Sequence, residues 1–97
     1  MELDFDYHNH TALSRCSRKD YTVAEMLARM QDIGLKHVGF CDHYYHDETV
    51  VARNIQCVRE GAAGFPGLEV YAGVEVDMLW AGHLDASYQT LAPFDYI

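Results

Sequence analysis

The sequence predicts an α/β fold built on a largely parallel sheet. The first indication is that several segments alternate apolar and polar residues, as strands do. The second is that two segments between them carry apolar residues at helical spacing. The third is the order strand, helix, strand, helix, strand, strand, which suits a sheet whose functional residues collect at the carboxyl ends of its strands. Because no internal repeat, low-complexity tract or linker interrupts the 97 residues, we expect one structural unit.

The first strand is predicted over residues 3–10. Its apolar side chains share one parity and its polar side chains the other, as on a pleated strand. The apolar set is Leu3, Phe5 and Tyr7, and the polar set is Asp4, Asp6, His8 and His10.

The next segment, residues 22–33, is predicted to be a helix. Thr22 and Glu25 have the spacing of a capping box at its start, and Gly34 stands where a helix commonly ends. The apolar residues at helical spacing are Val23, Met26, Leu27, Met30 and Ile33.

A short strand follows over residues 37–41 and ends in the polar pair Asp42 and His43. Thr49 is expected to open a second helix, which ends in the glycine-rich stretch 61–67. The residues of this helix that would face inward are Val51, Ile55 and Val58.

The cleanest alternation runs over residues 68–78 and predicts a long strand. Leu68, Val70, Ala72, Val74, Val76 and Met78 share one face, and Glu69, Tyr71, Gly73, Glu75 and Asp77 share the other. After a turn near Gly82, residues 94–97 have the pattern of another strand at its start.

The composition excludes several classes of protein. Hydrophobic residues make up 49% of the chain and charged residues 23%, which describes a folded globular protein rather than a disordered or collagen-like one. No apolar run approaches the ~20 residues that cross a bilayer, and the N-terminus lacks the basic and apolar regions of a secretory signal. The 3 cysteines are an odd number without CxxC spacing, so neither a disulfide framework nor a zinc ribbon is indicated. We therefore expect a cytoplasmic protein in a reducing compartment.

The charge of the chain narrows the choice of partners. Its formal net charge is −8, which repels nucleic acid and anionic membranes unless bound cations reverse the local field. We therefore expect neither a membrane nor a nucleic acid as partner.

Two histidines, His8 and His10, end the first predicted strand. Residues at positions i and i+2 of a strand project from the same face about 6 to 7 Å apart. Two imidazoles so placed can hold one metal ion. The alternative is a pair of ordinary polar histidines at a strand end.

Polar groups also stand on the two later strands. Asp42 and His43 follow the predicted strand 37–41, where the alternative is a capping or turn aspartate beside an exposed histidine. Glu75 lies opposite the apolar row of residues 68–78. A carboxylate buried in a parallel sheet must be paired or coordinate a cation, whereas in an edge strand it faces water.

These groups share one predicted edge of the sheet, because each lies at the carboxyl end of a parallel strand. The residues concerned are His8, His10, His43 and Glu75. Imidazoles with a carboxylate suit zinc, manganese or iron and argue against calcium, which prefers oxygen ligands. Asp6, on the parity of His8, is a candidate to accept a proton from a ligand imidazole and fix its tautomer; solvent exposure is its alternative.

The motifs combine over essentially the whole chain. They are Asp6-Tyr7-His8-Asn9-His10-Thr11, then Ser14, Gly34-Leu35, Gly39-Phe40-Cys41-Asp42-His43 and Gly73-Val74-Glu75-Val76-Asp77. In order, spacing and strand context this combination resembles the N-terminal portion of the PHP (polymerase and histidinol phosphatase) family. The pattern HxH…DH…GxE is specific as a whole, although each part alone is weak.

The resemblance implies a distorted (β/α)7 TIM-like barrel, of which this chain would be the N-terminal part only, because a complete barrel takes ~250 residues. It also implies up to three divalent transition metals, namely zinc, manganese or iron, and hydrolysis of phosphate esters by metal-activated water. By position, His8 and His10 would bind one ion, His43 another, and Glu75 would bridge two ions. No catalytic residue beyond the metal ligands is implied. Asp6 and Asp42 would support the ligands from behind.

Two departures from the family pattern stand out. Where members often carry a ligand histidine or aspartate, this chain has Cys16, which is either a thiolate ligand or a small apolar residue; Asp20 is the fallback ligand. The further histidines and the terminal DxH motif of the family do not occur before Ile97. The chain therefore resembles roughly the first third to half of a PHP domain, truncated before the rest of the barrel.

Other histidines and cysteines rank below these. His46 is a candidate phosphate contact or a solvated loop residue, and His37, at the beginning of its strand, faces the wrong end. Cys41 and Cys57 are expected in the core.

Two functional hypotheses follow. In the first, the chain belongs to a metal-dependent phosphoesterase that acts on a small phosphorylated substrate. In the second, it is a non-catalytic metal-binding or oligomerising module derived from a PHP domain. An incomplete barrel exposes a sheet edge and an apolar face, which invites another copy of the chain or a complementary chain.

Overall fold

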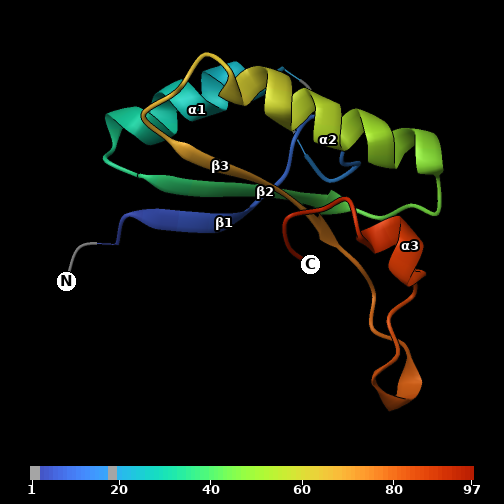
Figure 1. Cartoon of the computed structure of the whole chain (residues 1–97). Helices are drawn as coiled ribbons and strands as arrows, with labels where there is room; N and C mark the ends of the chain where they lie inside the picture. The colour runs from blue at the N-terminus through green and yellow to red at the C-terminus, as the bar shows by residue number, and fades with distance from the viewer. Residues whose placement is uncertain (1–2, 18–19) are drawn as a thin grey trace.

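The computed structural model describes residues 3–17 and 20–97. The elements in chain order are β1 (Phe5–Asn9), α1 (Val23–Asp32), β2 (His37–His43), α2 (Glu48–Ala62), β3 (Glu69–Glu75), a short 3-10 helix (Trp80–Gly82) and α3 (Tyr88–Leu91). The strands form one parallel sheet in the order β1-β2-β3 (Figure 1). The predicted α/β class and parallel sheet are therefore confirmed.

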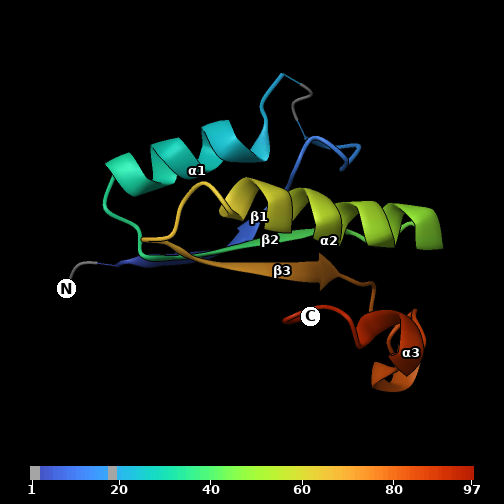
Figure 2. The same cartoon turned by 45° about the horizontal axis from the view of Figure 1, so that its top comes forward.

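The expected partial (β/α)7 TIM-like barrel is wrong. The described residues form an open sheet of 3 strands with α1 and α2 on one face, while α3 and the C-terminal segment lie on the other side (Figure 2). Closing a barrel requires strands that tilt and stagger around a common axis until the last pairs with the first. In the described part of the chain β1 and β3 instead remain the two edges of the sheet.

The main core lies between the sheet and the two long helices. Side chains from α1 and α2 meet the face of the sheet on which Val38, Phe40 and Ala72 project. Its fully enclosed members include Leu27 and Val38, each at 0% exposure. A second cluster, of Val51, Val74, Leu91 and Phe94, joins α2 and β3 to α3 and the chain that follows it.

Both ends of α1 follow from local sequence. The Thr22 hydroxyl accepts a hydrogen bond from the Glu25 backbone N–H and donates one to its carboxylate, each at 3.1 Å. At the other end Gly34 takes a φ of 94°, and the backbone N–H groups of Gly34 and Leu35 donate to the carbonyls of Gln31 and Met30. This is the Schellman arrangement that a glycine favours after a helix. The predicted start and end of this helix are confirmed.

The other elements differ from their predicted bounds. β2 runs on through Asp42 and His43, because both pair with β3, opposite Val74 and Glu75. β3 is shorter than residues 68–78 and ends at Glu75. α2 begins one residue before Thr49, with Asp47 as its N-cap.

The strand expected over residues 94–97 is not formed. This segment instead touches β3 through a single parallel bridge between Gly73 and Tyr96, with the Asp95 N–H donating to the Ala72 carbonyl at 2.7 Å. The helix α3 was not predicted. Its signal was Ser87, whose hydroxyl accepts from the Thr90 N–H at 3.2 Å as an N-cap does.

In the part of the chain that the structure describes, no helix has the length and apolar character needed to cross a bilayer.

Candidate metal centre

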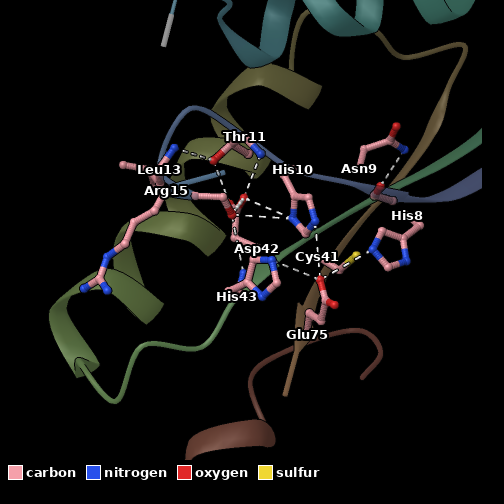
Figure 3. Close-up of polar contacts among 12 residues, drawn as sticks. His8, Asn9, His10, Thr11, Leu13, Arg15, Cys41, Asp42, His43 and Glu75 are labelled. Carbon is pink, nitrogen blue, oxygen red and sulfur yellow. Dashed lines mark hydrogen bonds and ion pairs between the residues drawn. The ribbon is translucent and has the colours of Figure 1, made fainter. Parts of the chain in front are cut away.

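Four polar side chains converge where the three strands end (Figure 3). They come from both ends of the HxH motif and from the last residues of β2 and β3, which face each other in the sheet register. The residues are His8, His10, His43 and Glu75. Parallel strands end at a common edge, and this brings residues far apart in sequence to one place.

The carboxylate of Glu75 is the centre of this cluster. Its Oε2 atom lies 3.4 Å from His8 Nε2, 3.3 Å from His10 Nε2 and 3.5 Å from His43 Nε2. The same oxygen is buried and accepts no hydrogen bond from the described residues. The Glu75 side chain as a whole is 36% exposed, but this oxygen faces three imidazole nitrogens, so protons on the rings or a metal ion would give it the positive partner that it lacks.

The spacing of these atoms fits a metal ion. Ligand atoms bound at about 2.0–2.2 Å to one tetrahedral ion lie about 3.3–3.6 Å apart. The distances from Glu75 Oε2 to the nitrogens, 3.3–3.5 Å, fall in this range. His8, His10 and Glu75 thus form a group of donors that can hold a metal ion.

A second group of donors adjoins the first. His10, Cys16 and His43 each place one ligand atom within 4.8 Å of the other two. The His10 and His43 rings stack with centroids 4.8 Å apart, and His10 belongs to both groups. Cys16 is exposed, unlike the two imidazoles.

Asp42 lies behind the histidines and holds the loop after β1. Its side chain is 2% exposed and accepts hydrogen bonds from the Thr11 N–H at 2.7 Å, the Thr11 hydroxyl at 2.6 Å and the Ser14 hydroxyl at 2.6 Å. His10 Nδ1 is 3.9 Å from Asp42 Oδ1 and 3.5 Å from Ser14 Oγ. The ring thus directs Nδ1 toward these oxygens and Nε2 toward Glu75. The HxH motif did not reveal the part played by Thr11 and Ser14, which depends on a loop folding over β2.

The backbone of β1 is irregular at the motif itself. The pairing of β1 with β2 shifts register between Asp6 and Asn9, and such irregularities re-aim side chains. The Asn9 side-chain amide donates to the Gly39 carbonyl at 3.0 Å, where it ties β1 to β2. Asp6 is exposed, which was the alternative to a contact with an imidazole, and its Oδ1 accepts a hydrogen bond from the His8 backbone N–H at 3.1 Å. Sequence reasoning missed Asn9.

The lower-ranked histidines lie outside both groups of donors. His37 pairs with Glu69 at 2.8 Å where β2 and β3 begin, at the far end of the sheet. His46, with a φ of 59°, pairs with Asp85 at 2.8 Å. Asp20 belongs to neither group among residues 3–17 and 20–97.

Of the two remaining cysteines, both expected in the core, Cys41 is buried and Cys57 is only partly buried. Cys41 is 5% exposed, its Sγ lies 3.5 Å from the Tyr7 carbonyl, and burial raises the pKa of its thiol. Cys57 packs against the main core, and burial raises the pKa of its thiol too.

A cavity of about 340 Å³ opens beside the cluster. Glu75 and His8 line it on the side of the cluster, and Tyr96, which lies across the sheet, lines it too. The Tyr96 ring rests on Gly39 and Gly73, where any Cβ atom would come within 3 Å of the ring or its hydroxyl. Burial raises the pKa of Tyr96, whose hydroxyl donates to the Tyr7 carbonyl. Tyr96 also was missed from the sequence, because only tertiary packing places it on these glycines.

Comparison with known proteins adds no relative. No protein-family model matches the chain, and no curated protein matches it. The resemblance to the PHP family accordingly stands on the motif residues themselves.

Proposed function

We propose that this chain provides the metal centre of a PHP-type phosphoesterase, which hydrolyses the ester of a small phosphorylated substrate. The observation that carries the proposal is the buried Glu75 Oε2, which has 3 imidazole nitrogens at 3.3–3.5 Å and no hydrogen bond from the described residues. Spacing and donor types both suit zinc, manganese or iron.

The ligands divide by position. His8, His10 and His43 all face one oxygen of Glu75, so His8, His10 and Glu75 would hold one ion, with His43 beside them on β2. By resemblance to the family, His43 would bind another ion, Glu75 would bridge two, and up to three ions would gather here. When bound, such ions lower the pKa of a water and stabilise charge on phosphate oxygens.

The residues around the proposed ligands orient His10 and leave room for a substrate. Asp42 and Ser14 face His10 Nδ1, which leaves Nε2 as the nitrogen directed at Glu75. The cavity of about 340 Å³ beside Glu75 can admit a small ester. Since the chain carries a formal charge of −8, bound cations are what would attract a phosphate to this edge of the sheet.

A matched pair of variants tests the proposal. Glu75→Gln changes the last residue of β3, and Glu69→Gln changes its first residue, at the far end of the sheet. With zinc or manganese added, the unchanged chain and Glu69→Gln should hydrolyse p-nitrophenyl phosphate. Glu75→Gln should lose at least about 100-fold in kcat/KM, because losing even an outer partner of a metal ligand costs 10- to 100-fold. Equal activity in the two variants would refute the proposal.

The open face of the sheet supports a second candidate function, a non-catalytic metal-binding module that oligomerises. β1 is an edge strand, and Phe5 and Tyr7 are 47% and 41% exposed. Exposed apolar side chains on an unpaired edge favour association with another chain. Stoichiometric metal without any turnover, together with a dimer in light scattering, would favour this candidate over the phosphoesterase.

A further inference from the structure

Cys16 lies next to the proposed metal centre but outside the group of His8, His10 and Glu75. We propose that Cys16 supplies a thiolate ligand alongside His10 and His43, and that this side of the centre therefore prefers a thiophilic divalent ion such as zinc over manganese. The inference rests on the metal centre proposed above but not on its hydrolytic activity.

The first support is geometric. One ligand atom from each of Cys16, His10 and His43 lies within 4.8 Å of the other two. Ligands at about 2.3 Å for sulfur and 2.0–2.1 Å for nitrogen around one tetrahedral zinc lie about 3.5 Å apart. Because Cys16 is exposed, rotation of its side chain can close the remaining gap without disturbing the core.

The second support is the loop that carries Cys16. Backbone hydrogen bonds from Ser14 to Thr11 and from Ser17 to Ser14 fold it into turns, and the Arg15 N–H donates to the Tyr45 hydroxyl at 2.9 Å. The residues on both sides of the thiol are thus held in place. Ser14 Oγ also lies 3.4 Å from the His43 N–H, from which it accepts a hydrogen bond. This loop is fastened directly to the end of β2 on which His43 stands.

The third support is that the other thiols are placed elsewhere. Within residues 3–17 and 20–97, neither Cys41 nor Cys57 belongs to a group of donors that can hold a metal ion. Cys41 is directed at the Tyr7 carbonyl, and Cys57 is on α2. A sulfur bound to metal in this protein should therefore come from Cys16.

The chemical consequence is a centre with two unlike sides. The group of His8, His10 and Glu75 offers nitrogen and oxygen, which suit zinc, manganese and iron alike, whereas the group with Cys16 offers nitrogen and sulfur. Thiolates select soft ions such as zinc and disfavour manganese. His10 belongs to both groups, and its Nδ1 faces Asp42 and Ser14. A ring nitrogen binds one ion at a time, so ions on the two sides would compete for His10.

Cobalt(II) is the probe, because its absorption reports sulfur ligation directly. Cobalt added to the metal-free chain should give visible ligand-field bands and, in the near ultraviolet, a sulfur-to-cobalt charge-transfer band. Cys16→Ser should remove the charge-transfer band and keep the ligand-field bands. The control Cys57→Ser should keep both. Circular dichroism of the metal-free variants checks that each is folded.

Zinc and manganese affinities test the selectivity. Cys16→Ser should weaken zinc binding at least about tenfold, the lower bound for losing an outer partner of a metal ligand. Manganese binding should change far less. Zinc should also slow alkylation of Cys16 by iodoacetamide, measured by peptide mass spectrometry, in the unchanged chain and in Cys57→Ser.

Each outcome separates this inference from the proposed function. Cobalt bound with ligand-field bands but no charge-transfer band in the unchanged chain would overturn the thiolate ligand and leave the group of His8, His10 and Glu75 intact. A charge-transfer band that survives in Cys16→Ser would overturn it as well. Failure of every form to bind cobalt, zinc or manganese would overturn both the metal centre and this inference. The turnover of Glu75→Gln tests the proposed hydrolysis and does not test whether Cys16 binds a metal ion.

Discussion

Asp42 is a buried residue that positions the candidate metal ligands without belonging to either group of donors. Its carboxylate accepts three hydrogen bonds from Thr11 and Ser14, residues that lie 28 to 31 positions earlier in the chain. The hydrogen bonds stabilise the loop and also place oxygens behind His10. A turn aspartate beside an exposed histidine was the alternative for this residue, and burial at 2% exposure argues against it.

Replacing Asp42 with asparagine tests this role. Asp42→Asn keeps the shape but loses the charge and one acceptor, so the free energy of unfolding should fall by about 1.5–3 kcal/mol, the usual range for hydrogen bonds to charged groups. Urea denaturation of the metal-free chain measures the change. The control Asp77→Asn removes an exposed carboxylate and should change stability little. Equal stability of the two variants would contradict the role given to Asp42.

Glu69 makes acid stability a second residue-scale test. Hydrogen bonds from Tyr71 and His37 hold the pKa of its carboxyl below the ordinary value. Because the folded pKa is the lower one, the stabilisation is present above the unfolded pKa and is lost as pH falls through the folded pKa. Urea unfolding from neutral to acid pH should therefore show a smaller loss of stability in Glu69→Gln than in the unchanged chain. If the free energy of unfolding fell equally with pH in both proteins, the lowered pKa of Glu69 would be contradicted.

Among the elements, α1 is determined by its own residues. Thr22 caps the first turn, so Thr22→Ala should lower the free energy of unfolding by about 1 kcal/mol, while Thr22→Ser, which keeps the hydroxyl, should lose much less. Thermal or urea unfolding measures both. A Thr22→Ala variant as stable as the unchanged chain would mean that packing alone defines the start of this helix.

The C-terminal segment is determined instead by what it packs on. A Cβ atom at Gly73 would lie 2.4–2.6 Å from atoms of the Tyr96 ring. Gly73→Ala should therefore displace the ring and lower the free energy of unfolding by about 1–3 kcal/mol, as overpacking does. Faster hydrogen exchange at the Val74 amide, which donates to the Tyr96 carbonyl, would report the displacement.

Gly64 provides the matched control for this variant. The nearest atom to a Cβ at Gly64 is 3.9 Å away, an ordinary contact. Gly64→Ala should leave stability unchanged or raise it slightly, because alanine reduces the freedom of the unfolded chain. If Gly73→Ala were as stable as Gly64→Ala, the packing of the Tyr96 ring on Gly73 would be contradicted.

At the scale of the whole molecule, a bound metal would tie the ends of the three strands together. An ion that binds only the folded chain stabilises it by about 2.7 kcal/mol at 100 times its Kd. For a domain of this size that corresponds to a rise in Tm of roughly 10–20 °C. Zinc should raise the Tm of the unchanged chain by this amount, a chelator should reverse it, and Glu75→Gln should respond far less. No rise at saturating zinc would count against the metal centre.

Several features of fold and site could be predicted because they depend on neighbours in sequence. The cap at Thr22 and the end at Gly34 involve residues three to five positions apart. The alternation in β1 and β3 identified strands, and the parallel order placed their carboxyl ends at one edge. The meeting of Glu75 with the histidines follows from that edge. The barrel could not be predicted correctly, because closure depends on which strands pair around an axis rather than on any local pattern.

The sequence by itself determined the three strands, the two long helices and the candidate donor residues, since periodicity, capping and residue type act over a few positions. Only the tertiary structure decided that the sheet stays open, that Asn9 ties an irregular β1 to Gly39, that Asp42 is enclosed by Thr11 and Ser14, and that Tyr96 lies on Gly73. The physical reason is that these contacts join residues from 23 to 31 positions apart or pair whole strands, and their free energy arises only when the chain has folded.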